Sequence, residues 1–269
     1  MNQPINRSTN QLIDYSLHLA DNALILAQRN AEWTGHGPVL EQDIAISNIA
    51  LDLVGQARNF YQYTAQLINN TTGQNIEVSN GQSATEDSLA FLRNADDFKN
   101  CLLVELEKGD WARTVLRQFL FSNYQFFLYR QLQQLNDATL AAIAAKAFKE
   151  VSYHLRWSAE WVVRLGDGTA ESNRRLGVAL QYLWSYTGEL TTHAVYESVL
   201  AGENSAVDLS TLKQSWMDKT KEVLVKACLQ IPLEKWMQSG GKEGRHTEHL
   251  GHLLAELQYL QRAYPGNTW

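Results

Sequence analysis

The chain has 269 residues, a net charge of −6 and a pI near 5.7, and 45% of its residues are hydrophobic. This length fits one large domain or two small ones, and the apolar fraction suffices for a full core without disulfides or metals. The acidic balance argues against nucleic-acid binding, which needs a clustered basic face. No stretch approaches the roughly 18 apolar residues of a membrane span, and the polar N-terminal residues lack the apolar core of a secretory signal.

The two cysteines, Cys101 and Cys228, lie far apart inside apolar segments. We expect both to be buried free thiols in a reducing compartment, with a disulfide as the alternative. Together with the charge and the absence of a membrane span, this predicts a cytoplasmic protein that binds neither nucleic acid nor membrane.

Proline usage indicates the fold class. The four prolines stand at positions 4, 38, 232 and 265, so residues 39–231 contain none. That stretch is rich in Leu, Ala, Gln, Glu and Arg, which are good helix formers. No run of short β-branched segments bounded by turn signals occurs. The sequence therefore predicts an all-α protein.

Hydrophobic periodicity predicts the elements in chain order. The predicted helices cover 11–29, 39–68, 87–107 (with a break near Asn94), 111–136, 138–165, 172–200, 209–229 and 246–264. Asp110 and Asp137 are predicted helix caps, and Gly166-Asp167-Gly168 is predicted as a left-handed cap. Residues 1–9 are expected to be a flexible end and 69–87 a mobile loop. Residues 10–269 are then a single domain, a bundle of long helices with additional C-terminal helices.

The helix predicted over 39–68 carries a polar stripe. Its segment 44–57 has Asp52 as its only charged residue, which predicts a helix buried on nearly all sides. Spacings of four, four and three place a set of polar side chains on one face: Asn48, Asp52, Gln56 and Asn59. Buried polar groups need partners, and the segment 149–156 offers Glu150 and His154 on one face. Either His154 or Arg156 is expected to offset the charge of Asp52.

Facing carboxylates and histidines suggest a di-metal carboxylate bundle, which needs a Glu from each of two helices and a Glu-x-x-His from each of the other two. Among the seven histidines only His246 has an acid three residues before it, and that residue, Glu243, lies in a glycine-rich turn. Three residues after Asp52 stands Gly55, which has no side-chain ligand. We therefore interpret the stripe as a vestigial polar site, made of Asn48, Asp52, Gln56, Glu150 and His154.

Two metal-binding alternatives remain. The pairs Glu150/His154 and Glu189/His193 are both Glu-x-x-x-His, a spacing that can bridge to a metal on a helix face. His246, His249 and His252 are spaced three apart, although no acid or cysteine is clearly placed to complete a zinc site. The simpler expectation for these three histidines is hydrogen bonding at the start of a helix.

Three long segments resemble one known family. They are AEWTGHGPVLEQDIAISNIALDLVGQARNF (31–60), KEVSYHLRWSAEWVVRLGDGT (149–169) and GGKEGRHTEHLGHLLAELQYLQRAYPG (240–266). These segments are similar to the PaaC subunits of the ring-1,2-phenylacetyl-CoA epoxidase complex, and the similarity covers nearly the whole chain. The resemblance implies a ferritin-like fold.

The same resemblance implies a function. In that family the complex inserts one oxygen atom into the aromatic ring of phenylacetyl-CoA during aerobic phenylacetate degradation. A homologous catalytic subunit holds the di-iron centre, and NADPH supplies electrons through a reductase component. This chain is then a structural subunit with no catalytic residue, metal ligand or cofactor of its own. Its expected partners are the catalytic subunit, the other epoxidase components and the substrate at the complex, with a homodimer open when the chain is alone.

The resemblance also implies contact with the CoA substrate near a subunit interface. The matching positions are Asp97, Phe98, Lys99 and Asn100, together with Ser198, Val199 and Leu200, where the match is poorer. Lys99 could meet a CoA phosphate as a point charge, although a solvated surface lysine is the plainer interpretation.

Two further functions stay open. One is an independent di-iron oxygenase or oxidase using Asp52, Glu150, His154, Glu189 and His193, against which Gly55 and Val151 count. The other is a stand-alone CoA-ester binding protein, which the acidic net charge disfavours because CoA is a polyanion.

Overall fold

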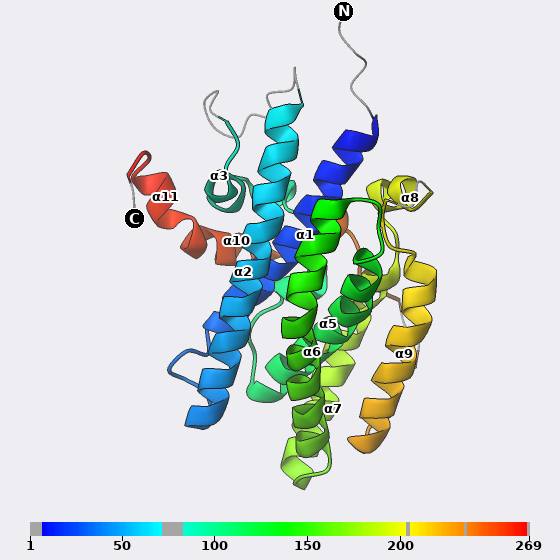
Figure 1. The fold of residues 1–269 in the computed structure, drawn as a ribbon. Coiled ribbons are helices and arrows are strands. Elements are labelled where there is room, and N and C mark those ends of the chain that lie inside the picture. Colours follow the sequence, from blue (N-terminus) through cyan, green and yellow to red (C-terminus); the bar gives the residue numbers. More distant parts are fainter. Residues whose placement is uncertain (1–6, 72–82, 203–204, 234–235, 268–269) are drawn as a thin grey trace, which may run out of the picture.

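The computed structural model describes residues 7–71, 83–202, 205–233 and 236–267, and all regular structure in these ranges is helical. The all-α prediction is thus confirmed. Four long helices form the bundle: α1 (Arg7–Ala31), α2 (Leu40–Asn70), α5 (Trp111–Leu132) and α6 (Ala138–Gly166). Helices α1 and α2 pack as one pair, α5 and α6 as another, and α2 contacts α6 (Figure 1).

Shorter elements connect and flank the bundle. Between α2 and α5 lie α3 (Glu86–Phe91), η1 (Ala95–Asp97) and α4 (Leu102–Glu105). The chain continues through α7 (Ala170–Leu183), η2 (Trp184–Tyr186), η3 (Gly188–Thr191), α8 (Val195–Gly202) and α9 (Leu209–Lys226), and ends with η4 (Gly241–Glu243), α10 (Glu248–Leu257) and α11 (Tyr259–Ala263). The last two leave the bundle on the side of α2 and α3 (Figure 1). None of the helices within the described ranges is long and apolar enough to cross a membrane.

Local capping explains the best-predicted boundaries. The Asp110 carboxylate accepts a hydrogen bond from the backbone N–H of Arg113 at 2.9 Å and starts α5. The Asp137 carboxylate accepts from Thr139 and Leu140 and starts α6. Such caps satisfy backbone donors that the first helical turn leaves free.

The predicted left-handed cap after α6 is wrong. Asp167 has φ −93°, and Gly168 is not among the glycines with positive φ. Gly166 is required for a different reason, because a Cβ there would lie 2.2 Å from the carbonyl oxygen of Ala227. The glycine therefore lets the end of α6 approach the end of α9.

The single helix predicted over 172–200 is also wrong. Helix α7 ends at Leu183, two 3-10 turns follow, and α8 begins only at Val195. At the break a Cβ on Gly188 would come within 2.9 Å of Met237, and Glu189 turns into the protein interior. Tertiary contacts thus override the local helix preference.

The two segments expected to be mobile are 1–9 and 69–87. Of these, residues 1–6 and 72–82 lie outside the described residues. Helix α1 already begins at Arg7 and α2 continues to Asn70. The Asn69 side chain pairs with both backbone groups of Ala84 at 2.9 Å, which holds together the two ends of the 69–87 connection. Both cysteines are free, and Cys101 is buried, but Cys228 is exposed, contrary to the sequence prediction.

Candidate functional site

Four residues of the predicted polar site meet where α2 packs on α6. His154 Nε2 lies 2.9 Å from Asp52 Oδ2, and the Gln56 amide donates to Glu150 Oε2 at 2.9 Å. The two pairs are about one helical turn apart on both helices. The prediction that these faces oppose each other is confirmed, and the partner of Asp52 is His154.

Gln56 also reaches the bundle interior. The Tyr129 hydroxyl donates to Gln56 Oε1 at 3.3 Å, and the Gln125 amide donates to that hydroxyl at 3.2 Å. Burial raises the pKa of Tyr129, so its hydroxyl stays protonated. The Gln56 amide therefore links α2, α5 and α6 by hydrogen bonds alone.

Two expectations about this face are wrong, and one alternative is decided. Asn48 is exposed and takes no part in the polar site. Of the two candidate partners of Asp52, Arg156 makes no ion pair with it, and its guanidinium lies 5.8 Å from the centre of the Tyr153 ring. Helix α2 is not buried on nearly all sides, since Leu51 is 67% exposed. The apolar composition of α2 predicted that all its faces are covered, but the described part of the chain covers one face only.

The residues present do not fit a di-iron centre. Glu189 lies in η3, where its carboxylate accepts hydrogen bonds from the backbone N–H groups of Leu102, Gly240 and Lys242. It therefore does not join Glu150, and the predicted Glu189/His193 helix face does not exist. Within the described ranges no group of three or more His, Cys, Asp or Glu side chains could hold a metal ion.

A buried ionic network that the sequence did not reveal surrounds Asp21, near the middle of α1. Asp21 is fully buried and pairs with Arg93, accepts from the Tyr61 hydroxyl at 2.5 Å and accepts from the backbone N–H of Lys99 at 2.8 Å. Arg93 also donates to the carbonyl of Asp97 at 3.0 Å. This network fixes the backbone of the Asp97–Asn100 segment.

A second network fixes the same segment from the C-terminal side. His246 Nδ1 lies 2.7 Å from the Glu105 carboxylate, and Nε2 lies 2.9 Å from the Phe98 carbonyl oxygen. Because both neighbours can only accept, both ring nitrogens must donate, which requires the imidazolium form. Burial opposes that charge, but the Glu105 carboxylate raises the pKa of His246 above its ordinary value. His246 is thus hydrogen-bonded at a helix start, as the sequence suggested.

A third buried pair completes this region. Lys242 Nζ donates to Glu197 Oε2 and to the carbonyl of Thr192, each at 2.9 Å. The glycines beside Lys242 let its backbone pass close to the backbone of Asn100. A Cβ on Gly241 would lie 2.3 Å from the Asn100 carbonyl oxygen, and Gly244 adopts φ +81°. The glycine-rich sequence was the available signal for this close approach of two backbones.

The predicted substrate-contacting residues divide into exposed and buried ones. Asp97 and Ser198 are exposed and Lys99 and Val199 half-buried, whereas the others are fully buried: Phe98, Asn100 and Leu200. Lys99 Nζ lies 3.4 Å from the Asp14 carboxylate and 5.7 Å from the centre of the Tyr196 ring. The Lys99–Tyr196 contact places the two predicted segments beside each other next to α1.

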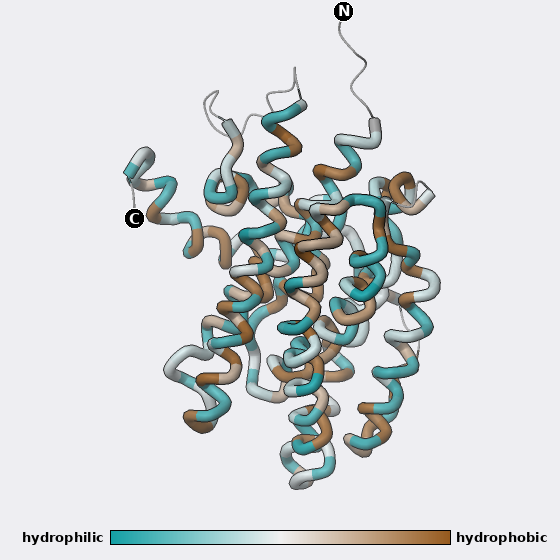
Figure 2. The backbone as a smooth tube through the Cα atoms, in the orientation of Figure 1, coloured by the Kyte–Doolittle hydropathy of each residue, from teal (hydrophilic) through white to brown (hydrophobic). Residues whose placement is uncertain are grey.

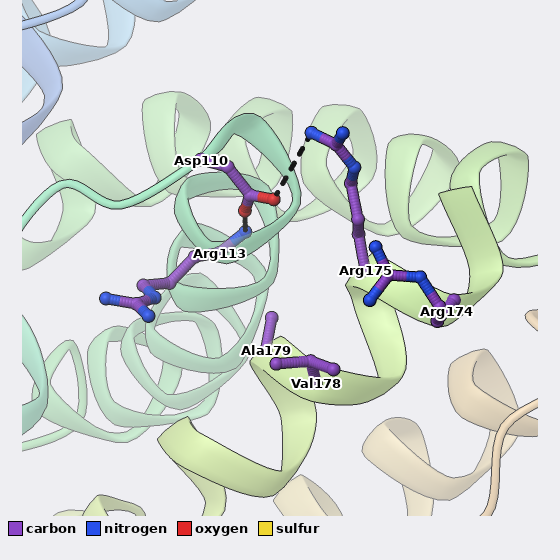
Figure 3. A pocket seen from close by; sticks show the side chains of 6 residues that line it. All are labelled: Asp110, Arg113, Arg174, Arg175, Val178 and Ala179. Atoms are coloured by element: carbon purple, nitrogen blue, oxygen red, sulfur yellow. Dashed lines mark hydrogen bonds and ion pairs between the residues drawn. The ribbon is translucent and has the colours of Figure 1, made fainter. Parts of the chain in front are cut away.

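A surface pocket of about 310 Å³ between α5 and α7 is lined by three arginines (Figure 3). The Arg113 guanidinium pairs with Glu107, while Arg174 and Arg175 pair with Glu171. Arg175 also approaches Asp110 at 3.9 Å, as Figure 3 shows. Because each arginine is matched by a carboxylate, the pocket carries no excess positive charge for an anionic ligand.

The buried His18 predicts a pH-dependent loss of stability. Burial, reinforced by Lys242, lowers the pKa of His18 to about 4, while its Nδ1 bonds the Lys99 carbonyl. Between about pH 6.5 and about pH 4 the unfolded chain therefore binds a proton that the folded chain does not. Stability should fall by roughly 3 kcal/mol as the pH drops through this window.

Urea unfolding of the wild type and of His18→Gln between neutral and mildly acidic pH measures the contribution of His18 to the free energy of unfolding. The variant should lack most of the stability loss that His18 causes, whereas carboxylate titrations affect both proteins alike. His246 does not interfere, because its raised pKa places its own titration above the window. Equal pH slopes for the two proteins would show that His18 is not kept neutral by burial.

Comparison with known proteins agrees with this architecture. A family model described as "Phenylacetic acid catabolic protein" matches residues 1–269. One relative is a subunit of the 1,2-phenylacetyl-CoA epoxidase of Escherichia coli (strain K12). It is 44% identical over 260 residues, covering 97% of this chain and 100% of that protein.

A solved Synechococcus protein with aldehyde deformylating oxidase activity has a TM-score of 0.53 at 14% identity and covers 95% of this chain and 100% of its own. At this identity the likeness shows the fold alone, and it confirms the predicted ferritin-like bundle.

Proposed function

The chain belongs to the phenylacetic acid catabolic protein family, and from this premise we propose that it is a non-catalytic structural subunit of a ring-1,2-phenylacetyl-CoA epoxidase. In this proposal a homologous partner subunit holds the di-iron centre, and a reductase component delivers electrons from NADPH. The chain itself supports the partner and holds no cofactor. The proposed setting is the cytoplasm, with which the two free cysteines are consistent.

The observation that carries the proposal is the pairing of the polar groups between α2 and α6. Glu150 receives the amide of Gln56 and Asp52 receives His154, so both carboxylates already have partners within the chain. Glu-x-x-His is also missing from both helices, because Gly55 follows Asp52 and Val151 precedes His154 at the relevant positions. The carboxylates of Asp52 and Glu150 therefore do not need a metal to offset their burial in a ferritin-like bundle.

We further propose that the chain contributes to substrate binding only as part of the complex. The exposed or half-buried Asp97, Lys99, Ser198 and Val199 are the side chains that a CoA moiety could reach. The buried Phe98 and Asn100 shape the segment instead, with Asn100 donating to Glu105 at 2.8 Å. Because Lys99 is already paired with Asp14, it is a weak attractor for phosphate when the chain is alone.

Metal content tests the proposal directly. We expect the chain purified alone from iron-supplemented cells to contain almost no iron and to consume no oxygen with a reductant. The catalytic subunit produced in the same cells is the matched control and should contain close to two iron atoms. Adding the chain to that subunit should increase the yield of the epoxide of phenylacetyl-CoA. Close to two iron atoms per chain, together with oxygen consumption by the chain alone, would instead identify an independent oxygenase.

A further inference from the structure

A surface pocket of about 560 Å³ lies between α5, α6 and α9, and none of its lining residues belongs to the polar site between α2 and α6. Four apolar side chains contribute to its lining: Phe126, Phe127, Leu155 and Ala159. The rings of Phe126 and Phe127 pack with their centres 5.3 Å apart. Apolar and polar stretches alternate along α6 and α9 in Figure 2, as in helices with one covered and one open face. The volume falls in the range of sites for small organic molecules.

The polar part of the lining carries an excess of positive charge. Arg130, Arg156 and Lys219 line the pocket together with one acid, Glu160. Lys219 and Glu160 each have a partner of opposite charge on their own helix. The Arg130 and Arg156 side chains contact only aromatic rings within the described ranges, with no carboxylate or other acceptor. Two guanidinium groups at this pocket therefore lack a counter-charge.

Each of these guanidinium groups lies over a ring. The Arg130 group is 4.9 Å from the centre of the Phe127 ring, and the Arg156 group is 5.8 Å from the centre of the Tyr153 ring. A guanidinium that contacts a ring through its face keeps the N–H donors at its edge for another partner. A carboxylate can accept two such donors in parallel. The pocket thus combines free anion-binding donors with an apolar surface.

This combination selects the chemical class of the ligand. An inorganic anion would use the donors but leave the apolar lining in water, and an uncharged apolar molecule would leave both guanidinium groups unmatched. The whole chain has a net charge of −6, so an unpaired positive pair is a local feature and not a consequence of composition. A ligand with one carboxylate and an apolar body matches both parts of the lining.

We propose that the pocket between α5, α6 and α9 binds a small organic acid, as its carboxylate, with an aromatic or alkyl body. Arg130 and Arg156 hold the carboxylate, and the body packs on Phe126, Phe127 and Leu155. Leu155 is only 8% exposed, so the ligand extends an apolar surface that is already part of the core. The site needs no metal and no other subunit, so it stands apart from the function proposed above.

Isothermal titration calorimetry of the whole protein with three probes tests the site. Naphthaleneacetate has both the carboxylate and the apolar body, naphthaleneacetamide lacks the charge, and acetate lacks the body. The protein should bind naphthaleneacetate at least tenfold more tightly than either of the other two. Replacing both arginines, as Arg130→Gln/Arg156→Gln, should weaken naphthaleneacetate at least tenfold and leave naphthaleneacetamide nearly unchanged.

The matched control is Arg174→Gln/Arg175→Gln, which removes the same charge from α7, where both arginines already pair with Glu171. This variant should bind naphthaleneacetate like the wild type, and circular dichroism should show all the proteins equally helical.

Three results would overturn the site. The first is no binding of naphthaleneacetate at millimolar concentration, or equal binding of the acid and its amide. The second is an equal loss of affinity in the two double variants, which would report only the overall charge. The third is an Arg130→Gln/Arg156→Gln variant that binds the acid normally but no longer co-purifies with the other epoxidase subunits, since the arginines would then serve an acidic protein partner. Iron content is not affected by any of these results, so the function proposed above is judged separately.

Discussion

Replacing Arg93 with methionine should lower the free energy of unfolding by about 3–5 kcal/mol, because it leaves the fully buried Asp21 carboxylate without its counter-charge. Methionine nearly keeps the volume of the side chain, so the loss reports on the missing charge and its hydrogen bonds rather than on a cavity. Arg93 also donates to the carbonyl groups of Leu89 and Asp97 and covers the Phe98 ring at 4.2 Å. Urea unfolding followed by circular dichroism measures the change.

Arg164→Met is the matched control for this variant. Arg164 lies 3.8 Å from Glu160 in an exposed pair on α6, with both side chains more than half exposed. Water screens such pairs, so this change should cost less than about 1 kcal/mol. Similar losses for Arg93→Met and Arg164→Met would mean that the Asp21–Arg93 pair is effectively solvated.

Replacing Lys242 with methionine should have an effect of similar size, about 3–5 kcal/mol, at the other end of the buried region. The Lys242 and Glu197 side chains are 3% and 2% exposed and bond at 2.9 Å. Burial opposes the charge of Glu197, but Lys242 holds the pKa of this carboxyl below its ordinary value. Without the ammonium group the carboxylate must take up a proton or remain unpaired, and both outcomes reduce stability near neutral pH.

A double-mutant cycle separates the pair from its surroundings. Glu197→Gln and Lys242→Met should each be strongly destabilising, while the combined variant should lose about 2–3 kcal/mol less than the sum of the two. The Thr192 carbonyl loses its donor in both backgrounds that lack Lys242, so that term cancels in the cycle. Additive losses would show that the two charges do not depend on each other.

The buried pairs share one consequence for the proposed subunit. Arg93 and His246 both bond backbone carbonyls of the segment 97–100, at Asp97 and Phe98 respectively. His18 bonds the next carbonyl, that of Lys99, at 2.7 Å. Three charged or polar side chains from distant parts of the chain thus fix the loop that the family resemblance assigns to substrate contact. We expect that loop to have one conformation before any ligand or partner arrives.

The sequence by itself determined the helical class and the positions of the main helices. Periodicity and capping act over about four residues, so Asp110 and Asp137 were identifiable as helix starts without knowledge of the fold. The opposition of Asp52 and Gln56 to His154 and Glu150 also followed from spacing, because residues four apart share a helix face. The long similar segments predicted the family, which the match over residues 1–269 confirms.

Only the tertiary structure decided which faces are covered and which distant charges pair. Asp21 and Arg93 are 72 positions apart and Glu105 and His246 are 141 apart, so no local pattern relates them. The end of α7 at Leu183 likewise depends on what packs against Gly188. An apolar helix such as α2 looks the same in sequence whether its own chain covers one face or several. Local periodicity records that a face is apolar, but burial is a property of everything that surrounds it.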